Sequence, residues 1–169
     1  GNVFVGLVHR LDRPVGGVMV FAKTSKGAAR LSKDIREGHF QKTYWAVVEG
    51  KPTIASGEIV QCLKKDEKKN RVTAFKKETR DAKRAELAFR LIKTHGGRSL
   101  IEIVPKTGRP HQIRVAMQSL DAPIVGDKKY GAATKLNGTI ALFARSLTFR
   151  KPVGGQEITI TATPPRLFS

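Results

Sequence analysis

Short strand-like runs dominate the hydrophobic pattern of the chain, and only two segments show helical spacing. Apolar residues recur at intervals of three and four in residues 25–37 and 110–120, which predicts two helices, with Ser25 capping the first. The helices and strands do not alternate regularly, which predicts an α+β fold. We expect a central, largely antiparallel (mixed) sheet with flanking helices. The predicted strands are residues 17–23, 43–48, 58–63, 71–75, 86–93, 99–104, 139–143, 147–149 and 157–163.

Nothing in the pattern divides the chain, because it contains no internal repeat, low-complexity tract or long linker. Its 169 residues suit one domain with its own core. No apolar run approaches the roughly 20 residues that cross a bilayer. We therefore expect one domain over residues 1–169.

The chain is strongly basic, with 32 Lys and Arg against 14 Asp and Glu and a net charge of +18. Folding does not require this imbalance, and self-repulsion makes it unfavourable. A nucleic acid is the partner that explains it best, since each neutralised phosphate releases counterions. Solubility and a membrane surface are the alternatives.

The residues that usually bind metals are sparse. Cys62 is the single cysteine, so an internal disulfide and a cysteine metal cluster are excluded. The four histidines are scattered without paired ligand spacing. We expect no metal.

Residues 9–13, with the sequence HRLDR, place one carboxylate among basic neighbours. This charge favours the ionised form of Asp12, which suits a nucleophile better than a general acid. In an extended segment, Arg10 and Asp12 share one face while Leu11 points to the core. The alternative is a structural salt bridge.

Two further segments carry candidate groups. Tyr44 lies on a predicted strand, where a tyrosine can stack on a base, transfer a proton or simply be core. Residues 107–114, TGRPHQIR, place two arginines at a predicted helix start, which is a good anion site. The anion is either an RNA phosphate or a carboxylate such as that of Asp12.

Residues 64–70 form the charged tip of a predicted hairpin. Lys64 and Lys65 there are candidates to grip RNA, because loops on rigid strands often carry binding residues. A solvated loop is the alternative, since Asp66 and Glu67 dilute the charge.

Together and in this order, these segments resemble the RluA-type pseudouridine synthases. Residues 9–12 resemble the family's H-R-L-D motif, and residues 42–50 its tyrosine strand. Residues 107–114 match T-G-R-x-H-Q-I-R, residues 123–131 match P-I-x-G-D-x-x-Y-G, and residues 141–149 resemble the last family segment.

The resemblance implies the pseudouridine synthase catalytic fold, an RNA cleft and no cofactor. It implies that Asp12 is the nucleophile, or an anionic catalyst, at the sugar or the base, and that the target uridine leaves the RNA stack. Tyr44 would stack on the flipped uracil and is a candidate to move its C5 proton. Arg114 would orient Asp12, and Leu142 would pack beneath the base. The expected RNA-binding residues are Arg10, Arg13, Arg109, His111, Gln112, Lys64 and Lys65.

Family members normally have preceding strands, and many carry a separate RNA-binding domain. We expect the chain to lack both. The expected substrate is ribosomal RNA, with transfer RNA second, and the expected state is a cytoplasmic monomer. The main rival is a non-catalytic RNA-binding module with the same fold. An RNA hydrolase is a third alternative, which would need a metal cluster or a base–nucleophile pair.

Overall fold

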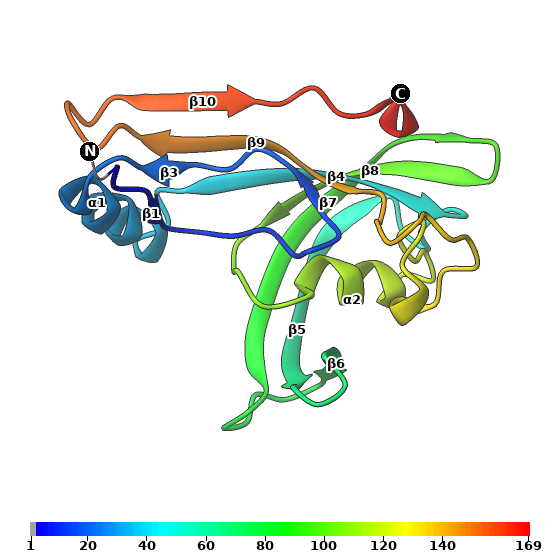
Figure 1. Ribbon diagram of the computed structural model, residues 1–169. Coiled ribbons are helices and arrows are strands. Elements are labelled where there is room, and N and C mark those ends of the chain that lie inside the picture. Colours follow the sequence, from blue (N-terminus) through cyan, green and yellow to red (C-terminus); the bar gives the residue numbers. More distant parts are fainter. Residues whose placement is uncertain (1–2) are drawn as a thin grey trace.

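A computed structural model describes residues 3–169 of the chain. Its centre is an eight-stranded sheet in the order β10-β9-β4-β8-β7-β5-β6, with β2 pairing in parallel with β9 (Figure 1). All the other pairs in this sheet are antiparallel, which confirms the α+β prediction. The strands are β2 (Gly16–Gly17), β4 (Gln41–Glu49), β5 (Ser56–Asp66), β6 (Arg71–Phe75), β7 (Lys83–His95), β8 (Arg98–Pro105), β9 (Leu142–Arg150) and β10 (Glu157–Thr161).

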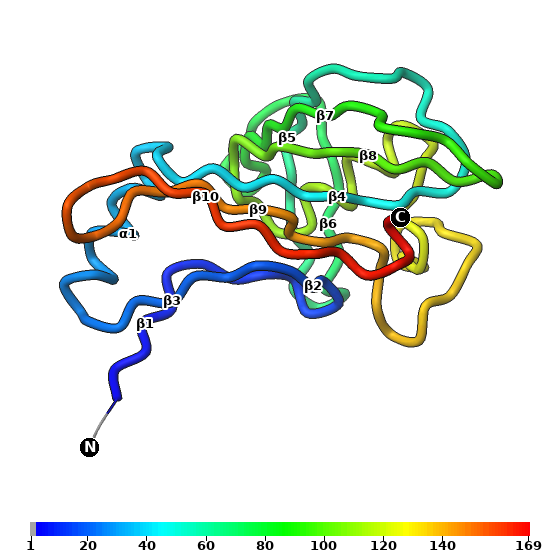
Figure 2. The backbone as a smooth tube through the Cα atoms, turned by 90° about the horizontal axis from the view of Figure 1, so that it is seen from above, coloured from blue at the N-terminus to red at the C-terminus, as the bar shows by residue number. Residues whose placement is uncertain are grey.

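The sheet bends along its length. Seen from above, β4 runs between β9 and β8 (Figure 2), while β5 and β7 curve away from the upper strands and end beside β6 (Figure 1). We call β5, β6 and their turn the basic arm. Two short 3₁₀ helices, η1 (Lys128–Tyr130) and η2 (Arg166–Phe168), complete the chain.

The helix α1 (Ser25–Arg36) lies at one end of the molecule, near the small sheet of β1 (Gly6–Leu7) and β3 (Phe21–Ala22). It buries Leu31 in a cluster with Phe40 and Phe149. Its cap is Thr24, not Ser25 as predicted. Thr24 has extended backbone angles, and its hydroxyl accepts the Gly27 N–H at 3.0 Å, whereas Ser25 is already helical.

The helix α2 (Gln112–Ser119) packs against the sheet and contributes Ile113, Ala116 and Met117 to the main core. The sequence predicted its start at Pro110. His111 precedes the helix in the left-handed conformation, with φ of 51°, so the regular turns begin at Gln112. No helix among residues 3–169 is long and apolar enough to cross a membrane.

The strand predictions near the ends of the chain were partly wrong. Two strands predicted at residues 139–143 and 147–149 form the single strand β9. Its pairing with β4 shifts at Arg145, whose guanidinium lies 5.0 Å from the Trp45 ring centroid. This bulge takes up the extra residue without ending the strand.

The predicted strand at residues 17–23 is interrupted as well, because only its two ends pair as β2 and β3. Gly17 has φ of +126°, and a Cβ there would lie 2.4 to 2.7 Å from the backbone of Ala144. This close approach joins the segment that follows Asp12 to β9.

Candidate active site

The sequence-predicted catalytic residues surround one cavity of about 150 Å³ beside α2. Asp12 lies at its mouth with a side chain that is 34% exposed. The loop that carries Asp12 is fixed because the Asp12 carbonyl accepts the Val15 N–H at 2.9 Å and β2 follows. The other lining residues are Arg10, Val15, Lys42, Tyr44, Pro105, Thr107, Gly108, Arg109, Pro110, His111, Gln112, Ile113, Arg114 and Leu142.

Arg114 faces the cavity from α2 with a side chain that is only 7% exposed. Its Nε and Nη2 donate to the two carboxylate oxygens of Asp127, each at 2.7 Å. Its Nη1 lies 4.0 Å from Asp12 Oδ2. Arg114 therefore faces Asp12 as expected, but its closest partner is the buried carboxylate of Asp127. Such a fork-like pair fixes the plane of the guanidinium.

The ring of Tyr130 packs against the Arg114 guanidinium that pairs with Asp127. The Arg114 Cζ lies 4.9 Å from its ring centroid. The Tyr130 hydroxyl accepts the Val72 N–H at 2.8 Å and lies 2.7 Å from His111 Nδ1, to which it can donate its own hydrogen. Burial, and then Arg114, lower the pKa of His111, which agrees with a neutral imidazole that accepts this bond.

We call Arg114, Asp127, Tyr130 and His111 the arginine corner. Through Val72 it connects the helix α2 to strand β6 of the basic arm. The sequence assigned residues 123–131 to a family segment but gave neither Asp127 nor Tyr130 a role. An acidic residue within an otherwise apolar and basic segment was the available signal.

Tyr44 is buried on β4 and lines the cavity. Burial, and then the charge of Asp12, raise the pKa of Tyr44 to about 12. The phenol is therefore neutral at pH 7, which suits an apolar surface for a base better than a proton acceptor. Leu142 is also buried and lines the cavity.

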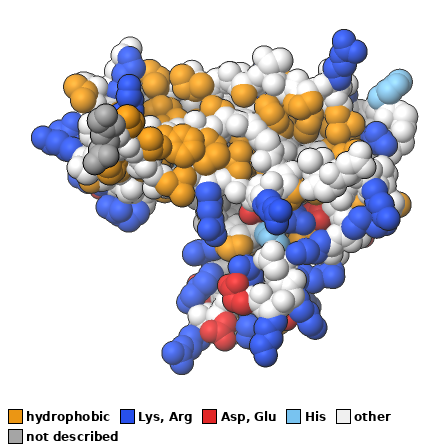
Figure 3. Space-filling model, in the orientation of Figure 1, with side chains coloured by type: hydrophobic (Ala, Val, Ile, Leu, Met, Phe, Trp, Pro, Cys, Tyr) orange, Lys and Arg blue, Asp and Glu red, His pale blue; other side chains and the backbone are white. Residues whose placement is uncertain are grey.

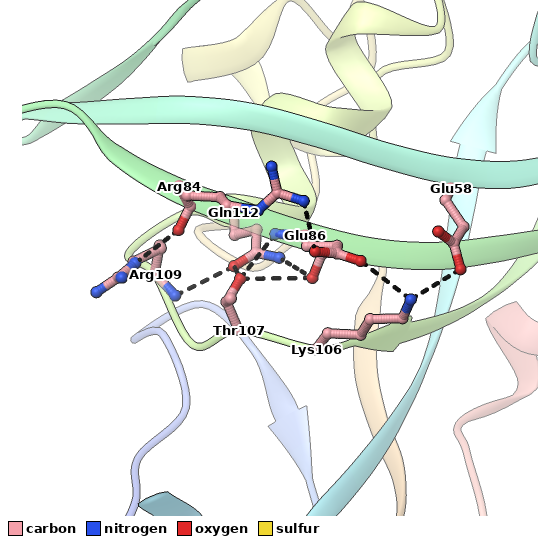
Figure 4. A network of polar contacts seen from close by, with 7 residues as sticks. All are labelled: Glu58, Arg84, Glu86, Lys106, Thr107, Arg109 and Gln112. Carbon is pink, nitrogen blue, oxygen red and sulfur yellow. Dashed lines mark hydrogen bonds and ion pairs between the residues drawn. The ribbon is translucent and has the colours of Figure 1, made fainter. Parts of the chain in front are cut away.

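Gln112 and Arg109 belong to a polar network that holds the segment before α2 against β7 (Figure 4). The Gln112 amide oxygen accepts the Thr107 hydroxyl at 2.7 Å and the Arg109 N–H at 3.2 Å, and its nitrogen donates to the Glu86 carbonyl at 2.8 Å. The Arg109 Nε donates to the Arg84 carbonyl at 3.0 Å, while the residue remains exposed. Gln112 thus shapes the cavity wall, and Arg109 stays accessible.

Several of the predicted RNA-binding residues line a second surface depression, which also includes Asp12. Arg10, Arg13 and Lys65 line it, together with Lys129. Lys64 does not, because it lies on the opposite side of β5. Both lysines have a carboxylate partner, Asp81 at 3.3 Å for Lys64 and Glu67 at 2.6 Å for Lys65. Figure 3 shows Lys and Arg gathered over the lower part of this face, where Figure 1 places the basic arm.

His9 is buried, and its Nε2 accepts the Val20 N–H at 3.0 Å. Burial, followed by the charge of Lys42, lowers the pKa of His9 to about 4. His9 is therefore neutral at pH 7 and does not hold Asp12 as a cation. Residues 3–169 contain no group of three or more His, Cys, Asp or Glu side chains that could hold a metal ion.

The chain is similar in sequence to RNA pseudouridine synthases. Residues 1–119 match the family model described as RNA pseudouridylate synthase. The chain is 36% identical to the ribosomal large subunit pseudouridine synthase C of Buchnera aphidicola subsp. Schizaphis graminum, over 94% of this chain and 53% of that relative. It is 37% identical to an RNA pseudouridine synthase of Zymomonas mobilis, over 96% of this chain and 74% of that relative.

Among solved structures, the human RNA pseudouridylate synthase domain containing 4 superposes with a TM-score of 0.80 at 26% identity. The match covers 97% of this chain and 73% of that one. The chain spans about half the length of the Buchnera relative.

Proposed function

Because the chain belongs to the RNA pseudouridylate synthase family, we propose that it isomerises uridine to pseudouridine in RNA. The observation that carries this proposal is the single cavity on which Asp12, Tyr44 and Arg114 meet. Ribosomal RNA is the proposed substrate, since relatives from Buchnera and Zymomonas are named as ribosomal large subunit enzymes. The relatives give no support to transfer RNA. A cytoplasmic monomer remains the proposed state.

Asp12 is the proposed nucleophile. Its carboxylate attacks C1′ of the ribose, and the N1–C1′ bond breaks with its electron pair staying on the uracil. The base turns, C5 attacks C1′ and the carboxylate is released. The C5 proton then leaves and N1 takes one up, so the product is an isomer of the substrate. Nothing is oxidised or hydrolysed.

The arginine corner supports this step by holding a positive charge in front of Asp12. The Arg114 guanidinium lies 4.0 Å from the Asp12 carboxylate, where it can orient that group toward the substrate. The two bonds to Asp127 fix the plane of the Arg114 guanidinium. Tyr44 and Leu142 would flank the flipped uracil, Tyr44 by stacking.

The cations around the mouth would bind the RNA backbone, and Lys65 would exchange its ion pair with Glu67, at 2.6 Å, for a phosphate. Unstacking the target uridine costs a few kcal/mol, which contacts from Arg13, Lys65 and Arg109 can offset. Arg10 lines both depressions, so it is the candidate to fill the space that the base vacates.

The test is the release of tritium to water from ribosomal RNA labelled at uracil C5. We expect release by the unmodified chain and a loss of at least about a thousandfold in Asp12→Asn, as for other nucleophile replacements. Asp34→Asn, on α1 and outside the cavity, is the matched control and should retain the full rate.

RNA binding without tritium release from the unmodified chain would contradict the proposal. That outcome would favour the non-catalytic RNA-binding module. Release that is equal in Asp12→Asn and the unmodified chain would contradict the role of Asp12 alone.

A further inference from the structure

Lys42 is a basic residue that lines the cavity, and the reaction steps proposed above assign it no role. It lies two residues before Tyr44 on β4, so both side chains leave the strand on the same side, and both line the cavity. In the described part of the chain, no carboxylate oxygen lies within 4.0 Å of its ammonium. The ammonium lies over the Phe40 ring, with 5.8 Å between Nζ and the ring centroid.

This environment is unfavourable for a lysine. A partly buried ammonium without a counter-charge loses hydration that no ion pair replaces. Burial accordingly lowers the pKa of Lys42. The neighbouring His9 is neutral at pH 7, so it does not change the net charge around the ammonium. Ionisable groups whose pKa is shifted by burial are often found in functional sites.

The reaction creates a charge that fits this cation. When the N1–C1′ bond breaks, the electron pair left on the uracil spreads over N1, O2 and O4. Arg114 is poorly placed to meet that charge, since two of its nitrogens bind Asp127 and the third faces Asp12. Lys42 remains available on the strand that carries Tyr44.

We propose that Lys42 is a further catalytic residue, whose ammonium contacts a carbonyl oxygen of the detached uracil and stabilises its negative charge. This inference rests on the proposed function. Lys42 stays protonated throughout, so the proton balance of the reaction is unchanged. The charged and titratable groups that share the cavity are Arg10, Asp12, Tyr44, Arg109, His111 and Arg114.

The experiment compares Lys42→Met and Lys42→Arg in single-turnover tritium release at saturating ribosomal RNA. We expect Lys42→Met to lose about a hundredfold in rate, as when one stabilising donor is removed from an active site. The Kd for RNA should stay within about twofold, and Lys42→Arg should recover most of the rate because it keeps the charge. Lys93→Met, on the exposed end of β7, is the matched control and should change neither quantity.

The pH profile gives a second readout. The rate of the unmodified chain should fall as pH rises through the pKa of Lys42, which lies below that of an ordinary lysine. Arginine keeps its charge at higher pH, so Lys42→Arg should move the alkaline fall upward. Both proteins use the same RNA, which cancels the ionisation of the substrate.

Three results would overturn the inference. An unchanged saturating rate with weakened RNA binding would assign Lys42 to a phosphate. Equal losses in Lys42→Met and Lys42→Arg, with lowered unfolding temperatures, would make its role structural. Absence of release from the unmodified chain would instead reject the proposed function and this inference with it.

Discussion

The arginine corner and the basic arm are both built from charges, but they differ in how those charges are held. In the corner, Arg114 and Asp127 are 7% and 1% exposed and meet in two short bonds. By contrast, Lys64 of the arm and Asp81, in the segment between β6 and β7, are 50% and 63% exposed and meet in one bond of 3.3 Å. Buried pairs lock a geometry, whereas exposed pairs exchange readily with water and salt. The corner is therefore suited to positioning, and the arm to attracting a polyanion.

The largest effect should come from Asp127→Asn. This change leaves the Arg114 guanidinium buried without its counter-charge, which costs about 3–5 kcal/mol of unfolding free energy. Asp81→Asn removes the exposed partner of Lys64 and should cost at most about 1 kcal/mol. Urea denaturation measures both values. Similar losses in the two variants would remove the distinction between the corner and the arm.

Tyr130→Phe should have an intermediate effect. Without the hydroxyl, the Val72 N–H and His111 Nδ1 lose their partner, which costs about 1–3 kcal/mol. Tyr44→Phe is the matched control. Tyr44 is buried as well, but burial and the charge of Asp12, with no hydrogen bond among the described residues, account for the raised pKa of its hydroxyl, so its loss should change stability little. Thermal unfolding compares the two. If Tyr130→Phe is as stable as the control, then the hydroxyl does not connect α2 to the arm.

The smallest effect should come from Lys65→Ala. We expect RNA affinity to fall a few-fold and the slope of log K against log salt to decrease by about 0.7 to 1, as for one lost phosphate contact. Lys64→Ala should change the slope less, because Lys64 lies outside the depression that Lys65 lines. Titrations of RNA at several salt concentrations test this. Equal slopes for both variants would show that the arm acts only through its overall charge.

Much of the fold was predictable from the sequence because hydrophobic periodicity reports local burial. The hairpin of β5 and β6 and the long pair β7 and β8 were confirmed with small changes in their ends. Predictions failed where tertiary contacts override local pattern. Two strands were predicted at residues 139–143 and 147–149, but β9 continues through Arg145, whose guanidinium lies over the Trp45 ring where the pairing with β4 shifts.

The candidate site likewise contains residues that the sequence predicts and pairings that only the folded structure shows. Asp12, Tyr44 and Arg114 could be found because each lies in a recognisable segment, and the structure brings them to one cavity. Asp127 could not be assigned as the partner of Arg114, because that pairing depends on how two segments 13 residues apart fold back on each other. The difference between Lys64 and Lys65 depends on which side of β5 each faces, which charge counting does not reveal.

The close contact at Gly17 shows how the position of Asp12 depends on a missing methyl group. The backbone of Ala144 occupies the space that any side chain at residue 17 would fill. The smallest possible substitution there would push β2 off β9 and carry the Asp12 loop with it, although it would alter no charge and no candidate catalytic group. A substitution at Gly17 would therefore displace Asp12 although Gly17 does not line the cavity. A search restricted to reactive side chains would not identify this position.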